Sequence, residues 1–446
     1  MLKGKNGVLL LIFGVFAFSL NVNATTLRDV VNQTINNSPK IKEQVHNYRA
    51  TIEDVKIAKK GWLPTLDYLG GIGYEETKNS STQFKNVNFH VYEQSLILSQ
   101  NIFNGWSTTH QIKTQEARVA AASYHMIEVV NDTSFNLTRY YIEVLKSREL
   151  LKIAKENIDI NKNIYTKIQK LYKAGLTTKS EREKVSASLA LARSNYITQE
   201  NQLRNALFQF KFYYGKSLAE NDFVEPIVDF NMPTSYKAGL DRTLKHNPSI
   251  IVQKYNIKVA KEDYKEKKSR YYPKVDIELR RSWDRNLGGV EGKDDRFRAM
   301  LTLQYNLFNG LKDKATIQKG ISKINQEVQI LGETKREAAQ TYDLSWVAYQ
   351  ELQKQLKYLL EYKKYAIKTL RLYSKEFDLG RRSLLDLLSA QNDLINSKSQ
   401  IVKTKYNLLF AKYRILDAEG DLVTTILKEN KPYNIKKVKD TLPKIN

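Results

Sequence analysis

Two long stretches without proline, residues 65–225 and 274–431, limit what this chain can fold into. In the second stretch, two columns of residues spaced seven apart begin at Ile317 and Ile321 and stay apolar through Phe377, with three polar exceptions. The corresponding columns of the first stretch carry five exceptions. A heptad repeat sustained over this length is typical of a coiled coil. Each stretch therefore predicts a helix of ~65 to 70 residues, or roughly 100 Å at 1.5 Å per residue.

The chain also repeats itself. Proline, glycine and a short aromatic motif recur in the same order in both halves, 209 positions apart at first and 205 positions apart later. An internal repeat of this size implies two copies of one structural unit. The matched positions are Pro39 and Pro248, Pro64 and Pro273, the motif Asn-Ile/Leu-Phe-Asn-Gly at 101–105 and 306–310, Gly175 and Gly380, and Gly215 and Gly420.

Between the second proline and the aromatic motif of each half, apolar and polar residues alternate. In the second half, apolar residues occupy the odd positions from Val275 to Trp283 and from Phe297 to Leu307. Alternation with period two predicts two strands, which the polar stretch 286–295 joins into a hairpin over about 274–308. The first half predicts a hairpin over about 65–103. Its second strand changes phase near Tyr92, so we expect a bulge or a late strand start there.

Helices flank each hairpin. Each long helix ends at a glycine, as helices commonly do, and a return helix follows it. The predicted domains are a signal peptide, repeat 1, a linker, repeat 2 and a basic tail. Their ranges are 1–24; 25–215, with a hairpin about 65–103, a long helix about 105–174 and a return helix about 178–214; 216–236; 237–420, with a hairpin about 274–308, a long helix about 311–378 and a return helix about 383–419; and 421–446.

The N-terminus has the features of an export signal. Lys3 and Lys5 precede an apolar stretch from Val8 to Leu20, which is too short to span a bilayer as a helix. The small residue Ala24 then matches a cleavage site, so a mature chain would begin at Thr25. A buried N-terminal helix is the alternative interpretation.

Composition narrows the possible functions. The chain has no cysteine and a formal net charge of +24. Such a charge suggests nucleic acid or anionic membrane as a partner, although Lys and Arg are spread over the whole length, which favours general compositional drift. The five histidines have no metal-ligand spacing, and the sequence lacks phosphate-binding loops and nucleophile elbows. We therefore expect no enzyme, no metal and no cofactor.

Four strands with one apolar face each cannot close a membrane barrel, because the smallest known barrels have eight. Open strand edges in lipid leave backbone groups unpaired at several kcal/mol each. Several chains must therefore share one barrel of 8 or 12 strands, as a dimer or a trimer. The polar surfaces of the helices place them outside that membrane, in the periplasm.

Together these motifs resemble the TolC family of outer-membrane efflux proteins, over roughly residues 25–420. The resemblance implies a mainly α fold with a membrane β-barrel: a homotrimer whose 12-stranded outer-membrane β-barrel continues into a long periplasmic α-helical barrel. It implies outer-membrane lipid, a periplasmic adaptor and an inner-membrane ABC or proton-driven transporter as partners, and no nucleic acid. The cargo would be protein, by type I secretion, or small molecules and drugs. Residues 216–236 and the tail from Lys428 would belong to an equatorial belt.

The resemblance also implies a periplasmic gate at the tips of the helical pairs. The family motif of glycine, arginine and two acids corresponds to Gly380, Arg382, Asp386 and Ser389, so the second acid is missing. Ser180 and Glu181 would be the partners of Arg382. Gly175 and Gly380 would form the tip turns and the site of adaptor docking. Phe377 replaces a frequent tyrosine. In the alternative interpretation, Asp386 and Glu181 are first-turn acids that the helix dipole favours.

Two other functions compete with the exit duct. A periplasmic adaptor also has long helical hairpins, although the duplicated pattern of helix, β-hairpin and helix argues against it. A nucleic-acid binder would explain the charge, but not the signal peptide or the amphipathic strands. The sequence does not choose the cargo, and the style of the motifs leans toward protein secretion.

Overall fold

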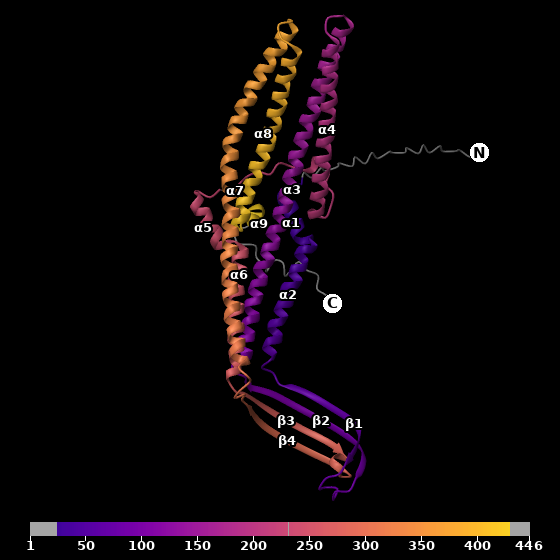
Figure 1. The fold of residues 1–446 in the computed structure, drawn as a ribbon, viewed down its shortest axis with the longest axis vertical. Helices are drawn as coiled ribbons and strands as arrows, with labels where there is room; N and C mark the ends of the chain where they lie inside the picture. The colour runs from indigo at the N-terminus through magenta and orange to yellow at the C-terminus, as the bar shows by residue number, and fades with distance from the viewer. Residues whose placement is uncertain (1–24, 231, 429–446) are drawn as a thin grey trace, which may run out of the picture.

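The computed structural model describes residues 25–230 and 232–428. The predicted signal peptide and residues 429–446 of the predicted tail lie outside the described residues. The protein is elongated, with a helical bundle along its long axis, a sheet at one end and the turns of two helical hairpins at the other (Figure 1). Among the helices of the described residues, none combines the length and the apolar character needed to cross a membrane.

The two halves have the same order of elements. In the first half these are α1 (Leu27–Asn37), α2 (Pro39–Lys60), β1 (Thr65–Thr77), β2 (Val87–Phe103), α3 (Ser107–Lys173) and α4 (Lys179–Tyr214). In the second half they are α5 (Tyr236–His246), α6 (Pro248–Lys268), β3 (Lys274–Arg285), β4 (Lys293–Gln304), α7 (Lys312–Asp378) and α8 (Leu384–Glu419), followed by α9 (Leu422–Leu427) in the predicted tail. Short 3-10 turns are η1 (Glu220–Asp222), η2 (Ser269–Tyr271) and η3 (Leu287–Gly289). Helices α3 and α7 have 67 residues each, and α4 and α8 have 36 each.

Prolines and caps divide the shorter helices. Pro39 and Pro248 stand at the first positions of α2 and α6, where the missing proline N–H costs nothing. Helix α2 packs on the half of α3 nearest the sheet, and α4 packs on the half farther away (Figure 1). Helices α6 and α8 are placed in the same way on α7. Because α3 also contacts α6 and α8, the two halves form one bundle.

The four strands form one antiparallel sheet in the order β1-β2-β3-β4. Residues directly opposite one another share a face of the sheet. Val275 lies opposite Leu303 and Ile277 opposite Leu301, which confirms that the odd-numbered apolar residues of this hairpin share one face. This apolar face continues across β2 and β1. Its exposed members include Leu66, Tyr68, Ile72, Tyr74, Leu96, Phe297, Leu301 and Leu303.

The other side, the polar face, carries arginines and acids from three strands. Arg280 lies opposite Arg298, and Arg296 lies opposite Ser282. With Glu93 and other residues of β1 to β4, these arginines line a hollow of about 380 Å³. The sheet therefore separates an apolar side from a charged side.

Two predictions for the strands are wrong. Alternation continues to Leu307, but β4 ends at Gln304, because Gln304 pairs with Lys274, the first residue of β3. Before Lys274 comes Pro273, which has no N–H to offer to a longer ladder.

The pairing of β1 with β2 shows no bulge near Tyr92. The register shift of β2 lies between Asn101 and Phe103, on the β3 side. The apolar phase changes near Tyr92 because η3 covers the polar face there. The backbone N–H of Gly288 donates to Glu75 on that face, and Val91 is buried.

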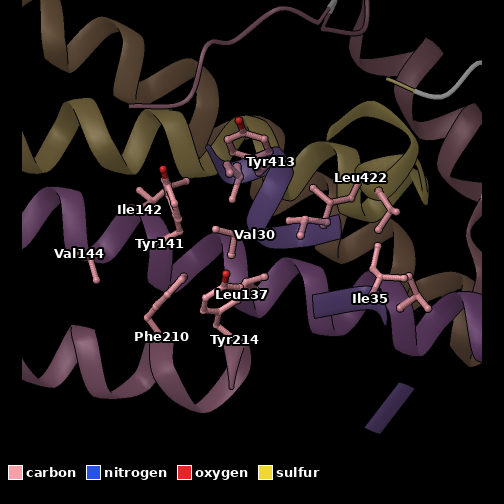
Figure 2. Packing of buried hydrophobic residues seen from close by; sticks show 14 of the residues in the cluster. Val30, Ile35, Leu137, Tyr141, Ile142, Val144, Phe210, Tyr214, Tyr413 and Leu422 are labelled. Atoms are coloured by element: carbon pink, nitrogen blue, oxygen red, sulfur yellow. The ribbon is translucent and has the colours of Figure 1, made fainter. Parts of the chain in front are cut away.

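The largest core cluster lies at the middle of the bundle and includes residues of α1, α3, α4, α8 and α9. Figure 2 shows Tyr141 of α3 close to Phe210 and Tyr214 of α4. The buried Tyr141 hydroxyl accepts from the N–H of Val224 at 2.9 Å and lies 2.7 Å from the Val224 carbonyl. Burial raises the pKa of Tyr141 to about 12. Arg148 donates to the carbonyls of Glu220 and Phe223. These bonds fasten the predicted linker across the bundle.

Candidate functional site

The two helical hairpins end in turns with the same backbone geometry. Gly175 and Gly380 both adopt a φ of +73°, a left-handed conformation that favours glycine. The N–H of Leu176 bonds to the carbonyl of Leu171, five residues earlier, and Arg381 bonds to Glu376 in the same way. This is the Schellman arrangement, which satisfies carbonyls at a helix C-terminus.

The return helices begin with equivalent caps. Thr178 accepts a hydrogen bond from the N–H of Glu181 at 3.3 Å, and Ser383 accepts one from the N–H of Asp386 at 3.2 Å. Both acids therefore stand in the first turn of a capped helix, where the helix dipole favours negative charge. Capping accounts for these two acids within one chain. It leaves their carboxylates accessible at the tips for a second role.

Arg382 is held by its own hairpin. Its Nε donates to Glu376 Oε2 at 2.9 Å, its Nη1 lies 3.9 Å from Asp386 Oδ2, and its guanidinium lies 4.2 Å from the ring centroid of Tyr373. The hydrogen bond to Glu376, the larger influence, raises the pKa of Arg382. Sequence reasoning missed Glu376 and Tyr373, although Tyr373 closes one of the heptad columns.

The predicted contact of Arg382 with Ser180 or Glu181 does not occur within the described chain, where the two tips are separate turns (Figure 1). Ser180 lies 2.8 Å from the hydroxyl of Thr178, and Glu181 accepts from Thr177. A contact between subunits stays a prediction. The first tip has a cation–π contact of its own, with Arg182 4.6 Å from the ring centroid of Tyr172.

A different pair of residues joins the two hairpins near their tips. Lys167 of α3 forms an ion pair with Asp378 at the end of α7, and its ammonium lies 5.4 Å from the ring centroid of Phe377. Ile168 and Leu384 belong to one small buried cluster beneath this pair. Phe377, where the family often has tyrosine, therefore contributes an apolar surface to the contact between the hairpins.

The seam between α3 and α8 continues away from the tips through polar contacts. Lys398 forms an ion pair with Glu156, and Gln391 donates to Asn157 Oδ1 at 3.4 Å. Exposed ion pairs contribute little each, about 0–1 kcal/mol. A seam fastened by such contacts and a small apolar cluster can open without disrupting the equatorial core.

A buried carboxylate lies at the other end of α8. Glu419 has no exposed surface, and within the described residues neither of its carboxylate oxygens has a hydrogen-bond partner. The nearest cation is Arg242 of α5, 3.6 Å away, which also pairs with Asp421. Burial raises the pKa of Glu419 to about 7, while Arg242 opposes that shift. Sequence reasoning missed this residue, because a single glutamate at the end of a polar helix belongs to no pattern.

Comparisons with known proteins agree with this architecture. The outer membrane efflux protein family matches residues 30–216 and 239–420. The proteases secretion protein PrtF of Dickeya chrysanthemi is 21% identical over 328 residues, 69% of each chain. The outer membrane efflux protein BepC of Brucella suis biovar 1 (strain 1330) is 20% identical over 374 residues, 82% of this chain and 79% of BepC.

Among solved structures, the CmeC outer membrane channel of Campylobacter jejuni superposes with a TM-score of 0.79. The match covers 93% of this chain and 89% of CmeC at 16% sequence identity, so it supports the fold. The family match spans both halves of the sequence, including both hairpin tips. The chain belongs to the outer membrane efflux protein family.

Proposed function

We propose that three copies of this chain form an exit duct through the outer membrane, with one 12-stranded barrel continuing into a tube of helices in the periplasm. The observation that carries this proposal is the open sheet. Strands β1 and β4 are its two edges, neither pairs with a further strand in the described residues, and the whole apolar face is exposed. Membership of the family decides against the adaptor and nucleic-acid alternatives.

The physical argument starts at the edges. Each unpaired N–H or C=O of β1 and β4 would cost several kcal/mol in hydrocarbon. Pairing β4 of one copy with β1 of the next removes both edges, and three copies supply twelve strands. With 13 residues in β1 and 12 in β4, both edge strands exceed the ~9–11 residues that span a bilayer.

The helices support the same assembly. Besides its two partly buried columns, α7 has a third column with exposed members Leu344, Tyr358, Tyr365, Leu372 and Leu379, spaced by multiples of seven. Large apolar side chains repeated along one exposed stripe mark an interaction surface. We infer that this stripe packs against a helical hairpin of the adjacent copy.

A duct of this kind needs partners that supply energy. We propose that the turns at Gly175 and Gly380 dock a periplasmic adaptor, which links the duct to an inner-membrane transporter. The names of the relatives specify protease secretion for PrtF and efflux for BepC. Comparing secreted proteins and antibiotic susceptibility in cells with and without this gene would distinguish protein cargo from small molecules.

We also propose that the duct rests closed at the tips. Three copies of Asp386 would converge on the axis, and Arg382 of one subunit would hold Ser180 or Glu181 of another. The support is that the carboxylate of Asp386 and the guanidinium of Arg382 remain accessible at the hairpin turns. Coiled-coil hairpins repack between discrete arrangements, so a few polar contacts can bias the closed state.

The assembly is tested on purified full-length protein in detergent. Native mass spectrometry should show three copies, and a planar bilayer should show discrete conductance steps. Heating in SDS should convert the trimer band on a gel to a monomer band. A monomer without conductance would refute the duct, and a conducting dimer with eight strands would refute the trimer.

A further inference from the structure

Two cations oppose each other at the end of the sheet farthest from the helices. Arg285, the last residue of β3, lies directly opposite Lys293, the first residue of β4. Like charges in directly opposite positions destabilise a strand pair. Both side chains are exposed, and among the described residues neither pairs with a carboxylate. A repulsive pair kept without a counter-charge indicates that an anion from outside the chain compensates it.

Aromatic residues lie next to this pair on the same face. Tyr92 of β2 lies opposite Arg285. Trp283 precedes Arg285 by two positions, so alternation places it on the same side. That side is the apolar face, because Ile277 and Leu279 continue the same alternation along β3. Aromatic side chains at the end of an apolar band are typical of the boundary between hydrocarbon and water.

The neighbouring charges leave the two cations available. Arg281 forms an ion pair with Asp295, and its guanidinium lies 5.8 Å from the ring centroid of Trp283. Within the described strands β3 and β4, Asp295 is the one acid that alternation places on this face beside the cations, and Arg281 occupies it. The end of the apolar face therefore has a surplus of positive charge.

The surface between these side chains is hollow. Tyr92, Trp283, Arg285 and Lys293 are among the residues that line a hollow of about 530 Å³ on β2, β3 and β4. Guanidinium binds phosphate oxygens in a bidentate fashion, and an ammonium adds a second charge. The aromatic rings offer an apolar wall on the side toward the membrane.

We propose that this hollow binds the phosphate-bearing headgroup of a lipid in the outer leaflet. Arg285 and Lys293 contact the phosphate, and Tyr92 and Trp283 pack against the upper part of the lipid. This proposal rests on the proposed function, in which the apolar face lies in the membrane and the turn 286–292 faces outward. Lipid is the occupant because the cations stand at the border of an apolar surface, where a free anion would leave the aromatic wall unused.

The test uses the purified full-length trimer in detergent and titrates it with three probes: a glucosamine lipid with two phosphates (lipid A), the same lipid without phosphates, and inorganic phosphate. Native mass spectrometry counts the bound lipids. We expect the phosphorylated lipid to bind and the other two probes to bind at least tenfold more weakly. Equal binding of the dephosphorylated lipid, or of inorganic phosphate, would overturn the assignment.

The variant Arg285→Gln with Lys293→Gln should lose at least tenfold in affinity. Arg285→Lys with Lys293→Arg, which keeps both charges, should retain most of it. Lys184→Gln with Arg204→Gln, an equal loss of charge at exposed positions on α4, is the control. Unchanged binding by the first variant refutes the lipid site.

Trimer formation and bilayer conductance are measured on the same samples. If the wild-type protein forms no conducting trimer, the proposed function fails. If it conducts but does not bind the phosphorylated lipid, the lipid site alone fails.

Discussion

Replacing Glu419 by Gln should stabilise the protein at alkaline pH and leave it nearly unchanged in acid. Glu419 is buried at the end of α8, without a hydrogen-bond donor for either carboxylate oxygen among the described residues. The charges that face it are Arg242 from α5 and Asp421 from the segment between α8 and α9, and Arg242 is shared between the two acids. An ionised carboxylate in this place lacks the compensation that water gives it in the unfolded chain.

The magnitude follows from the pKa. Burial raises the pKa of Glu419 from 4.5 to about 7. A raised carboxyl pKa means that the folded state binds the proton more tightly, so stability falls as pH rises from about 4.5 to about 7 and is constant above. A difference of about 2.5 pH units corresponds to about 3 kcal/mol per subunit. With an unfolding entropy of roughly 2 cal/mol/K per residue, this is a shift of ~3 °C in Tm.

The assay is thermal unfolding of detergent-solubilised protein, followed by the helical circular dichroism signal at pH 4 and pH 8. We expect Glu419→Gln to raise Tm by ~3 °C at pH 8 relative to wild type and by under ~1 °C at pH 4. Glu361→Gln, at an exposed position on α7, is the control and should show no such difference. In an Arg242→Met background, the effect of Glu419→Gln on Tm at pH 8 should be larger, because Arg242 opposes the raised pKa of Glu419. A Tm difference that is independent of pH would refute the reasoning.

Three further outcomes test the duct. Arg382→Ser with Glu181→Ala should raise single-channel conductance and sensitise cells to bulky antibiotics, because each lost polar link is worth ~0.5–3 kcal/mol and trimer symmetry multiplies it; parental conductance in normal trimers would place the gate elsewhere. Leu301→Arg on the apolar face should block assembly at ~2–4 kcal/mol per subunit, while Thr302→Arg on the polar face should be tolerated, and equal tolerance of both contradicts the membrane placement. If the arginines of the polar face set selectivity, reversal potentials across a salt gradient should show anion preference that Arg298→Glu weakens; cation preference in the wild type would assign selectivity to the Asp386 ring.

Much of the fold could be predicted because its elements obey strict local periods. A heptad column tolerates few exceptions over 67 residues, so α3 and α7 are visible in the sequence. Gly175 and Gly380 mark the ends of these helices because a left-handed turn favours glycine. Alternation in β3 and β4 located the hairpin, but it could not locate the end of β4, which depends on where the paired strand begins.

The site residues were harder to predict, since their roles depend on contacts between distant segments. Glu376 lies six residues before Arg382, and nothing in local spacing shows that it is the closest partner. The pair of Lys167 and Asp378 spans two repeats, and neither residue belongs to a matched motif. The phase change near Tyr92 was visible, but its cause is a 3-10 turn from the other hairpin that covers β2.

The two tips show how the repeats have diverged while keeping one backbone. Their C-terminal turns and N-caps are equivalent, yet each tip has placed its arginine differently: Arg182 follows the cap Thr178, whereas Arg382 precedes the cap Ser383. Backbone geometry is therefore held by glycine and capping residues, and the charged side chains are free to vary without loss of the turn. In a trimer with two kinds of tip, contacts between unlike hairpins can then be tuned separately from the stability of each hairpin. This separation lets a latch weaken, as with Ser389 in place of an acid, while the helical tube stays intact.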